Sequence, residues 1–177
     1  MMTRRELLKC GLIGGAGLIT GCSAPTSTVG EPASFSDNRY GYGFLTEEDR
    51  IIVAAIAPVM LASALPADTA QQRLRVREIV RGVDYAIGLL TEATRDELRD
   101  LFGVLGNAMG RVVLAGIWSQ WSRVSSHEVA EFLDEWRNAY LDLLRQGYHG
   151  LHELITAAWY GNPASWDAIG YAGPPRI

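Results

Sequence analysis

From Leu45 onward, apolar residues recur every three or four positions, which is the spacing of one helix face. The clearest stripe predicts a helix from Asp68, with apolar side chains at Val76, Ile79, Val83, Ala86 and Leu90. No stretch alternates apolar and polar residues in the way that predicts a half-buried strand. We therefore expect an all-α fold, a bundle of about five helices, mostly antiparallel because their connections are short.

Four residue pairs mark expected helix starts, because a Thr, Ser or Asp side chain can cap the free N–H groups of a first turn. The pairs are Thr46 with Asp49, Asp68 with Gln71, Thr94 with Glu97, and Ser125 with Glu128. Pro58 falls inside the first helix, where its ring should kink or shorten it. Residues 65–68 are the expected break before the second helix.

The third and fourth helices contain glycines that make their bounds harder to predict. The third apolar stripe comprises Leu98, Phe102, Leu105, Met109 and Val112, interspersed with Gly103, Gly106 and Gly110. Each glycine costs about 1 kcal/mol relative to Ala in a helix interior. Close approach of a neighbouring helix would justify that cost and is the favoured interpretation, with a locally irregular helix as the alternative.

The fourth stripe predicts one long helix, with apolar side chains at Val129, Leu133, Trp136, Tyr140 and Leu143. Gly147 and Gly150 are expected to interrupt it. A last short helix is then expected from about 151 to 160, followed by a segment that cannot continue as a helix.

The start of the chain has a different pattern: a basic beginning, a short Gly-rich apolar stretch and a small-residue cleavage site. Arg4 and Arg5 fit a twin-arginine export motif, and residues 19–22 fit a lipobox whose Cys22 would be lipidated. The apolar stretch, 11–21, is shorter than the roughly 20 residues of a membrane span. The alternatives are a chance arginine pair, and ordinary cleavage that leaves Cys22 free.

These patterns divide the chain into four parts. We expect a signal peptide at 1–21, a flexible tether at 22–44, a helical domain at 45–160 and an irregular tail at 161–177. The mature chain would be a periplasmic lipoprotein that the twin-arginine translocase exports and that Cys22 anchors to the membrane. Its 156 residues are enough for one domain with its own core.

Charge and composition exclude several classes of function. The chain has 16 basic and 20 acidic residues, and removal of the signal leaves 13 and 19, a net charge of −6. Such a protein has no general attraction for phosphate backbones, so we expect no nucleic-acid partner. Lys9 is the only lysine, and Cys10 and Cys22 are the only cysteines. Lipidation of Cys22 would therefore leave no thiol for metal binding or catalysis.

No sequence motif predicts a catalytic, cofactor-binding or metal site. His149 and His152 share a helix face beside Glu153, and two histidines with a carboxylate can bind a metal. The spacing matches no zinc motif, so exposed histidines are the favoured interpretation and a small metal-dependent enzyme is the minor alternative.

The tail, 161–177, is aromatic, rich in Gly and Pro and lightly charged, with one short turn expected around 165–169. Its rings must pack on the bundle or on another protein. The candidate partner-binding residues are Trp159, Tyr160, Asn162, Pro163, Trp166, Ile169, Gly170 and Tyr171. The pair Trp118 and Trp121 is more typical of packing than of ligand stacking.

Three segments resemble the gluconate 2-dehydrogenase subunit 3 family: the twin-arginine start, the helix opening at 45–49 and, most specifically, the ending at 159–174. The resemblance implies a non-catalytic small subunit that carries a folded large subunit through the export route. That large subunit would be a glucose–methanol–choline (GMC) type sugar or alcohol dehydrogenase holding FAD, and a cytochrome c subunit often receives the electrons. The segment 65–68 is shorter than the family's Pro-rich stretch, and the lipobox is not general in the family.

The resemblance leaves one main alternative, a stand-alone envelope lipoprotein with a structural or scaffold role. In that case the aromatic tail would pack on its own bundle. In the favoured interpretation, the partner subunit binds FAD and this chain binds no cofactor.

Overall fold

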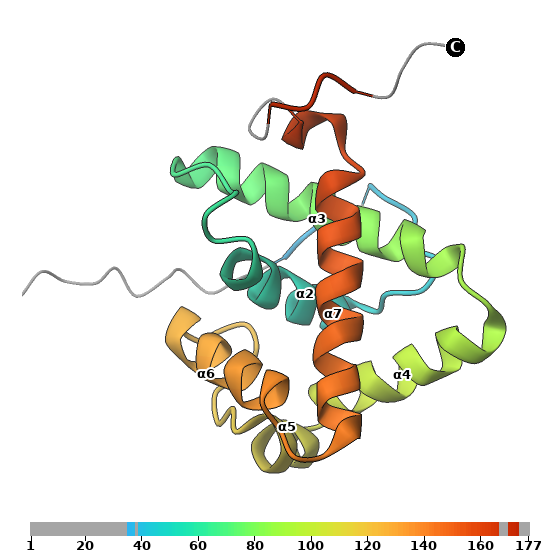
Figure 1. The fold of residues 1–177 in the computed structure, drawn as a ribbon, viewed down its shortest axis with the longest axis vertical. Coiled ribbons are helices and arrows are strands. Elements are labelled where there is room, and N and C mark those ends of the chain that lie inside the picture. The colour runs from blue at the N-terminus through green and yellow to red at the C-terminus, as the bar shows by residue number, and fades with distance from the viewer. Residues whose placement is uncertain (1–34, 38, 167–169, 174–177) are drawn as a thin grey trace, which may run out of the picture.

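A computed structural model describes residues 35–37, 39–166 and 170–173, and the described part is helical without strands (Figure 1). This confirms the all-α class. The helices are α2 (Glu47–Met60), α3 (Thr69–Gly88), α4 (Glu92–Gly106), α5 (Ala108–Ala115), α6 (Ser126–Arg137) and α7 (Asp142–Tyr160), and a 3-10 turn, η1, spans Pro163–Ser165. None of the helices in these ranges is both long enough and apolar enough to cross a bilayer. Arg4, Arg5, Cys22 and Ile169 lie outside the described residues.

Three of the four expected helix starts are confirmed. Thr46 and Asp49 form a reciprocal capping box, Asp68 caps α3 by accepting from the N–H of Gln71, and Ser125 and Glu128 form the box that begins α6. The start expected at Thr94 is wrong. Thr91 caps α4, and its hydroxyl accepts from the N–H of Thr94. Because α3 continues to Gly88, only residues 89–91 remain to connect the two helices.

Pro58 lies inside the last turn of α2 and does not end the helix at once. The helix continues to Met60, where the N–H of Leu61 closes it by donating to the carbonyl of Ala57. Proline has no N–H to donate to the carbonyl of Ala54, so one hydrogen bond of the helix is missing.

The third stripe is broken into two helices, so the irregular alternative is correct. Of the three glycines, only Gly106 faces a helix from outside this stripe, where a Cβ would lie 3.2 Å from the Glu48 side chain of α2. Asn107 ends α4 and caps α5, since its side-chain oxygen accepts from the N–H groups of Met109 and Gly110. A Cβ on Gly110 would lie 2.3 Å from the carbonyl oxygen of Val104. Only glycine therefore fits this corner.

The bounds expected for the fourth stripe are also wrong. α6 ends at Arg137, and α7 runs unbroken from Asp142 through Gly147 and Gly150 to Tyr160. Gly147 serves packing instead of interrupting the helix, because a Cβ there would lie 2.6 Å from Cζ3 of Trp136. The missing side chain lets α7 rest on the indole ring at the end of α6.

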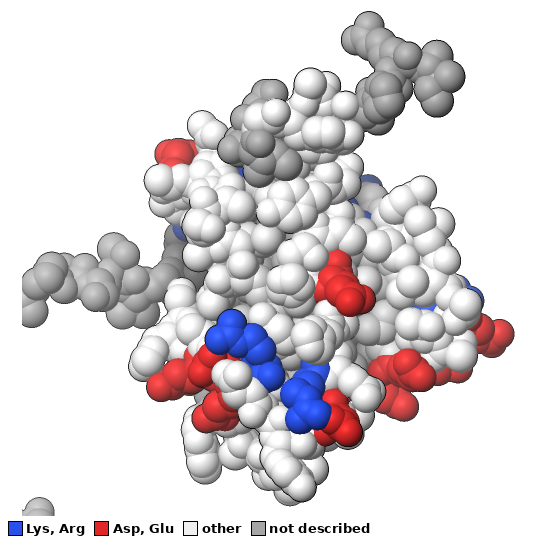
Figure 2. All heavy atoms as spheres, in the orientation of Figure 1, with Lys and Arg blue, Asp and Glu red and all other residues white. Residues whose placement is uncertain are grey.

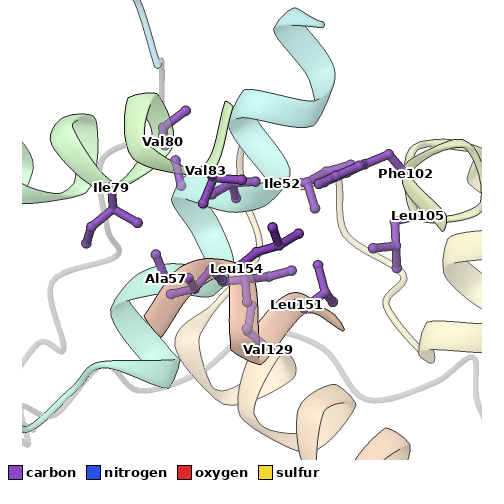
Figure 3. Packing of buried hydrophobic residues seen from close by; sticks show 14 of the residues in the cluster. Ile52, Ala57, Ile79, Val80, Val83, Phe102, Leu105, Val129, Leu151 and Leu154 are labelled. Atoms are coloured by element: carbon purple, nitrogen blue, oxygen red, sulfur yellow. The ribbon is translucent and has the colours of Figure 1, made fainter. Parts of the chain in front are cut away.

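The core lies where α3 and α7 cross, which is the most extensive helix contact in the described structure (Figures 1 and 3). Gly82 and Ala158 meet at this crossing, and a Cβ on Gly82 would lie 2.9 Å from that of Ala158. α2 packs against both helices and contributes Ile52 and Ile56, which are fully buried. Figure 3 shows side chains from α2, α3, α4, α6 and α7 converging on one cluster.

Candidate partner-binding surface

The first two residues expected to bind a partner, Trp159 and Tyr160, have different environments. Trp159 is buried in the core, and its indole N–H has no hydrogen-bond partner among the described residues. Tyr160, the last residue of α7, is 47% exposed. Trp159 can therefore support a docking surface from within, whereas Tyr160 reaches the surface itself.

Asn162 and Pro163 begin η1 and fix the tail to the bundle. The Asn162 side-chain oxygen accepts from the N–H of Ala164 at 3.0 Å, and its Nδ2 donates to Glu78 on α3 at 2.9 Å. Ser165 is fully buried, and its hydroxyl donates to the carbonyl of Asn162 at 2.8 Å. The described turn thus begins before the one expected at 165–169.

Trp166 folds the chain back toward the end of α7. Its indole Nε1 donates to the carbonyl of Tyr160 at 2.8 Å, and its ring meets the edge of the Tyr171 ring at a centroid distance of 5.3 Å. The positive φ of Gly170, 67°, allows this return, because side-chain-bearing residues rarely adopt it. We name Tyr160, Trp166 and Tyr171 the tail surface; Tyr171 is 45% exposed.

A second, unexpected apolar surface lies at the opposite end of the molecule from the tail (Figure 1). The indole of Trp136 donates to the carbonyl of Leu114 at 2.7 Å, which joins the end of α6 to α5. Exposed apolar side chains project from α5, from the residues after it, from the α6–α7 connection and from the first turn of α7. We name this set the α5-end surface: Met109, Val113, Leu114, Trp118, Tyr140, Leu141 and Leu143.

The sequence assigned Met109, Tyr140 and Leu143 to the apolar stripes of helices. In the structure they are 73%, 96% and 74% exposed, respectively. The breaks at Asn107 and Asn138 turn these positions outward, and periodicity alone gave no signal of either break. Trp118 and Trp121 also separate: Trp118 is exposed, while Trp121 is buried and donates to the carbonyl of Leu105 at 2.7 Å.

An open cleft of about 520 Å³ lies between the start of α2 and the α4–α5 corner. Its charged lining comprises Glu47 and Glu48 from α2 and Arg111 from α5. The Arg111 Nε atom is buried without a hydrogen-bond partner in the described structure. Charges of both signs line the cleft, which gives it no clear preference for an anion or a cation.

The histidines of the minor alternative lie on the outer face of α7. Tyr148 stacks on the ring of His152 at 5.9 Å and meets the edge of His149 at 5.6 Å. Across the described ranges, no three or more His, Cys, Asp or Glu side chains converge in a way that could hold a metal ion.

Residues 35–37 and 39–45 form a strap that packs on the bundle, although the sequence assigned 22–44 to a flexible tether. The buried carboxylate of Asp84 on α3 accepts from three successive backbone N–H groups, those of Gly43, Phe44 and Leu45, at 2.8–2.9 Å. Arg99 on α4 donates to the carbonyl of Phe44 at 2.6 Å. Part of the segment expected to be a tether therefore packs on the bundle.

Asp37 holds the beginning of the strap. Arg81 on α3 donates two hydrogen bonds of 2.7 Å to its carboxylate, and the Tyr42 hydroxyl donates a third of 2.9 Å. The Arg81 bonds lower the pKa of Asp37 to about 2, against the opposing effect of burial, and the Tyr42 bond adds to the lowering. Burial, followed by the neighbouring Asp37 carboxylate, raises the pKa of the Tyr42 phenol.

No protein-family model matches the chain, and no curated protein or solved structure matches it either.

Proposed function

We propose that this chain is the non-catalytic small subunit of a periplasmic, FAD-dependent dehydrogenase of the GMC type. It escorts the folded catalytic subunit through the twin-arginine route and anchors it to the membrane. Arg4 and Arg5 provide the export signal, and lipidated Cys22 provides the anchor. FAD and the chemical step belong to the large subunit, and a cytochrome c subunit accepts the electrons.

The observation that carries this proposal is the ordered tail surface. Tyr160 and Tyr171 are about half exposed, and Trp166 between them is held by its bond to the carbonyl of Tyr160. Aromatic side chains on a surface are frequent anchors of protein interfaces. A surface that is already fixed loses little conformational freedom on binding, which favours affinity.

The way the tail is attached also favours a docking role. Asn162 bonds to Glu78, and Glu78 in turn pairs with Arg75 at 2.7 Å. The tail is thus fixed to α3 by polar contacts, while its aromatic rings stay partly open to solvent. A partner that covers these rings would bury apolar area without displacing the core.

The test is affinity purification of the tagged chain from its native envelope, with an absorbance spectrum of the eluate. We expect a large protein with flavin bands, present in about equal amount to the chain. The control is a tagged chain with Tyr160→Ala and Tyr171→Ala, which should recover much less flavin. A colourless chain that elutes alone would contradict the proposal.

A stand-alone envelope lipoprotein is the second candidate, and one observation favours it. Ser165 is completely buried and Asn162 bonds to α3, so part of the tail already packs on its own bundle. A stable monomer in the same purification, with no co-eluting protein, would support this function over the first.

A further inference from the structure

The α5-end surface contains the most exposed large apolar side chains of the described structure. Tyr140 is 96% exposed and Trp118 is 80% exposed. Such side chains stand clear of their neighbours, whereas those of the tail surface are about half-buried and are held by the tail. A bilayer needs no shape complementarity, because lipid adapts to what is inserted, and Trp and Tyr are the residues that favour its interface.

The charge of this end also suits a lipid surface. Within 107–118 the only charged residue is Arg111, and within 138–145 Asp142 is paired with Arg145. The mature chain is acidic overall, and one acidic side chain borders this end: a Cβ on Gly116 would lie 3.6 Å from a carboxylate oxygen of Glu135. In Figure 2 the lowest part of the face, where α5 and the α6–α7 connection lie in Figure 1, carries uncharged side chains.

Backbone carbonyl groups of the α6–α7 connection are hydrogen-bonded within the protein, which suits a medium poor in water. Arg145 donates to the carbonyls of Ala139 and Tyr140 at 2.6 and 3.0 Å, and Asn138 donates to the carbonyl of Asp134 at 2.9 Å. Unpaired backbone groups are costly to bring toward hydrocarbon. Two carbonyls beside the most exposed side chain are already paired within the protein.

The length of chain before the strap lets this surface reach a membrane. From a limit of roughly 3.6 Å per residue, the segment from Cys22 to Phe35 can extend at most about 45 Å. A domain of this size has a diameter of roughly 40 Å. A lipid on Cys22 would therefore keep the domain within reach of the bilayer.

We infer that the α5-end surface is a membrane-contact surface, which inserts Trp118, Tyr140 and Leu143 into the interface of the bilayer that holds Cys22. The inference rests on the lipid anchor of the proposed function. It adds an orientation: the tail surface, at the other end of the molecule, points away from the lipid. An enzyme docked there would be held clear of the bilayer while the chain itself lies on it.

The experiment uses the chain as purified from its native envelope, reconstituted into phosphatidylcholine vesicles whose acyl chains carry bromine. Bromine quenches the fluorescence of a tryptophan that enters the bilayer. Trp121, Trp136 and Trp159 are buried, and Trp166 lies at the far end of the molecule. We therefore expect Trp118→Phe to lose most of the bromine-dependent quenching. Equal quenching in both proteins, or none in either, would overturn the inference.

A matched pair of double variants tests whether the quenching depends on this surface or on exposed apolar side chains in general. Tyr140→Ser with Leu143→Ser should lower the quenching of Trp118, because the neighbouring anchors are lost. Tyr85→Ser with Leu89→Ser removes two other exposed side chains, 66% and 71% exposed, from the end of α3 and the residue after it, and should leave the quenching unchanged. Equal losses in the two variants would contradict a specific surface.

Mass spectrometry of the same sample shows whether Cys22 carries a lipid, so the membrane-contact surface and the lipid anchor can be tested separately. A lipidated Cys22 with unquenched Trp118 overturns the membrane surface and leaves the escort function standing. A Cys22 without lipid removes the anchor and overturns the inference with it. The flavin recovered in the affinity purification judges the escort function independently of both outcomes.

Discussion

Gly147 on α7 and Trp136 on α6 lie so close that a Cβ on the glycine would be 2.6 Å from Cζ3 of the indole. The indole is itself held, because its N–H donates to the carbonyl of Leu114. The contact therefore links α5, α6 and α7 at one point. A glycine that breaks the apolar pattern in the sequence is what allows the helices to pack in the structure.

Gly147→Ala should lower the free energy of unfolding by about 1–3 kcal/mol, the usual cost of overpacking a rigid core. Gly150→Ala, one turn later on the same helix, is the matched control, since nothing lies within 4 Å of the Cβ it would add. That change should stabilise by up to about 1 kcal/mol through helix propensity. Urea denaturation of the two variants measures both values. If the Gly147→Ala protein were as stable as the Gly150→Ala protein, the helices would be able to accommodate a Cβ beside Trp136 without loss of stability.

Asp84→Ala should destabilise the fold by about 2–4 kcal/mol, because it leaves three strap N–H groups without their acceptor. Asp100→Ala on the exposed face of α4 is the control and should change stability by less than about 0.5 kcal/mol. Denaturation gives the free energy, and hydrogen exchange of the Phe44 amide reports the strap directly. Unchanged protection of that amide would argue against the role of the carboxylate.

Asp37 should stabilise the fold in a pH-dependent way. Its pKa in the folded state is about 2, below the ordinary value of 3.8, so its stabilisation is present above about pH 4 and is lost as the pH falls through 2. Arg81 is partly exposed, and allowing for solvent screening we expect Asp37→Asn to cost about 1 kcal/mol at pH 6. The gap between wild type and variant should close near pH 2. A gap independent of pH would mean that the ion pair is not its source.

Tyr160→Ala with Tyr171→Ala should reduce the recovery of a flavoprotein partner while leaving the melting temperature nearly unchanged, because both side chains are about half exposed. Tyr85→Ala, an exposed tyrosine on α3, is the control and should recover the partner fully. Trp159→Ala would not test docking, since removing a buried indole typically costs about 3–5 kcal/mol. Full recovery by the double variant would remove the tail surface from the docking site.

Local signals in the sequence predicted the helical class and three of the four helix starts. A capping box is complete within four residues, so Thr46 with Asp49 and Ser125 with Glu128 needed no information from the rest of the fold. Thr94 with Glu97 had the spacing of a capping box, whereas Thr91 caps α4 in the structure. The choice between them depended on how far α3 extends, which its packing against α7 helps to decide.

Several of the misses share one physical cause, which is that apolar spacing does not show what covers a side chain. Tyr140 and Leu143 continue the stripe of α6 in sequence, yet both are exposed after the break at Asn138. Asp84 shows the reverse. A carboxylate inside an apolar stripe is buried because its partners lie about 40 residues upstream, and no local pattern could have indicated them.

The candidate site was only partly accessible from sequence. The aromatic ending pointed to Tyr160, Trp166 and Tyr171, and two of these rings are now seen half exposed at one end of the molecule. The tail is attached to α3 by the bond between Asn162 and Glu78, which lie 84 positions apart. This bond could be recognised only in the folded structure. The α5-end surface was hidden because its members look like core residues in the sequence.

The crossing of α3 and α7 determines when this chain can finish folding as it is synthesised. Gly82 and Ala158 meet only after nearly the whole chain has been made, and until then the apolar face of α3 that packs on α7 has no cover. Contacts of such long sequence separation form late and leave partly made chains prone to aggregation. A protein truncated before α7 should therefore be insoluble, and a nascent chain would need protection until its last helix emerges.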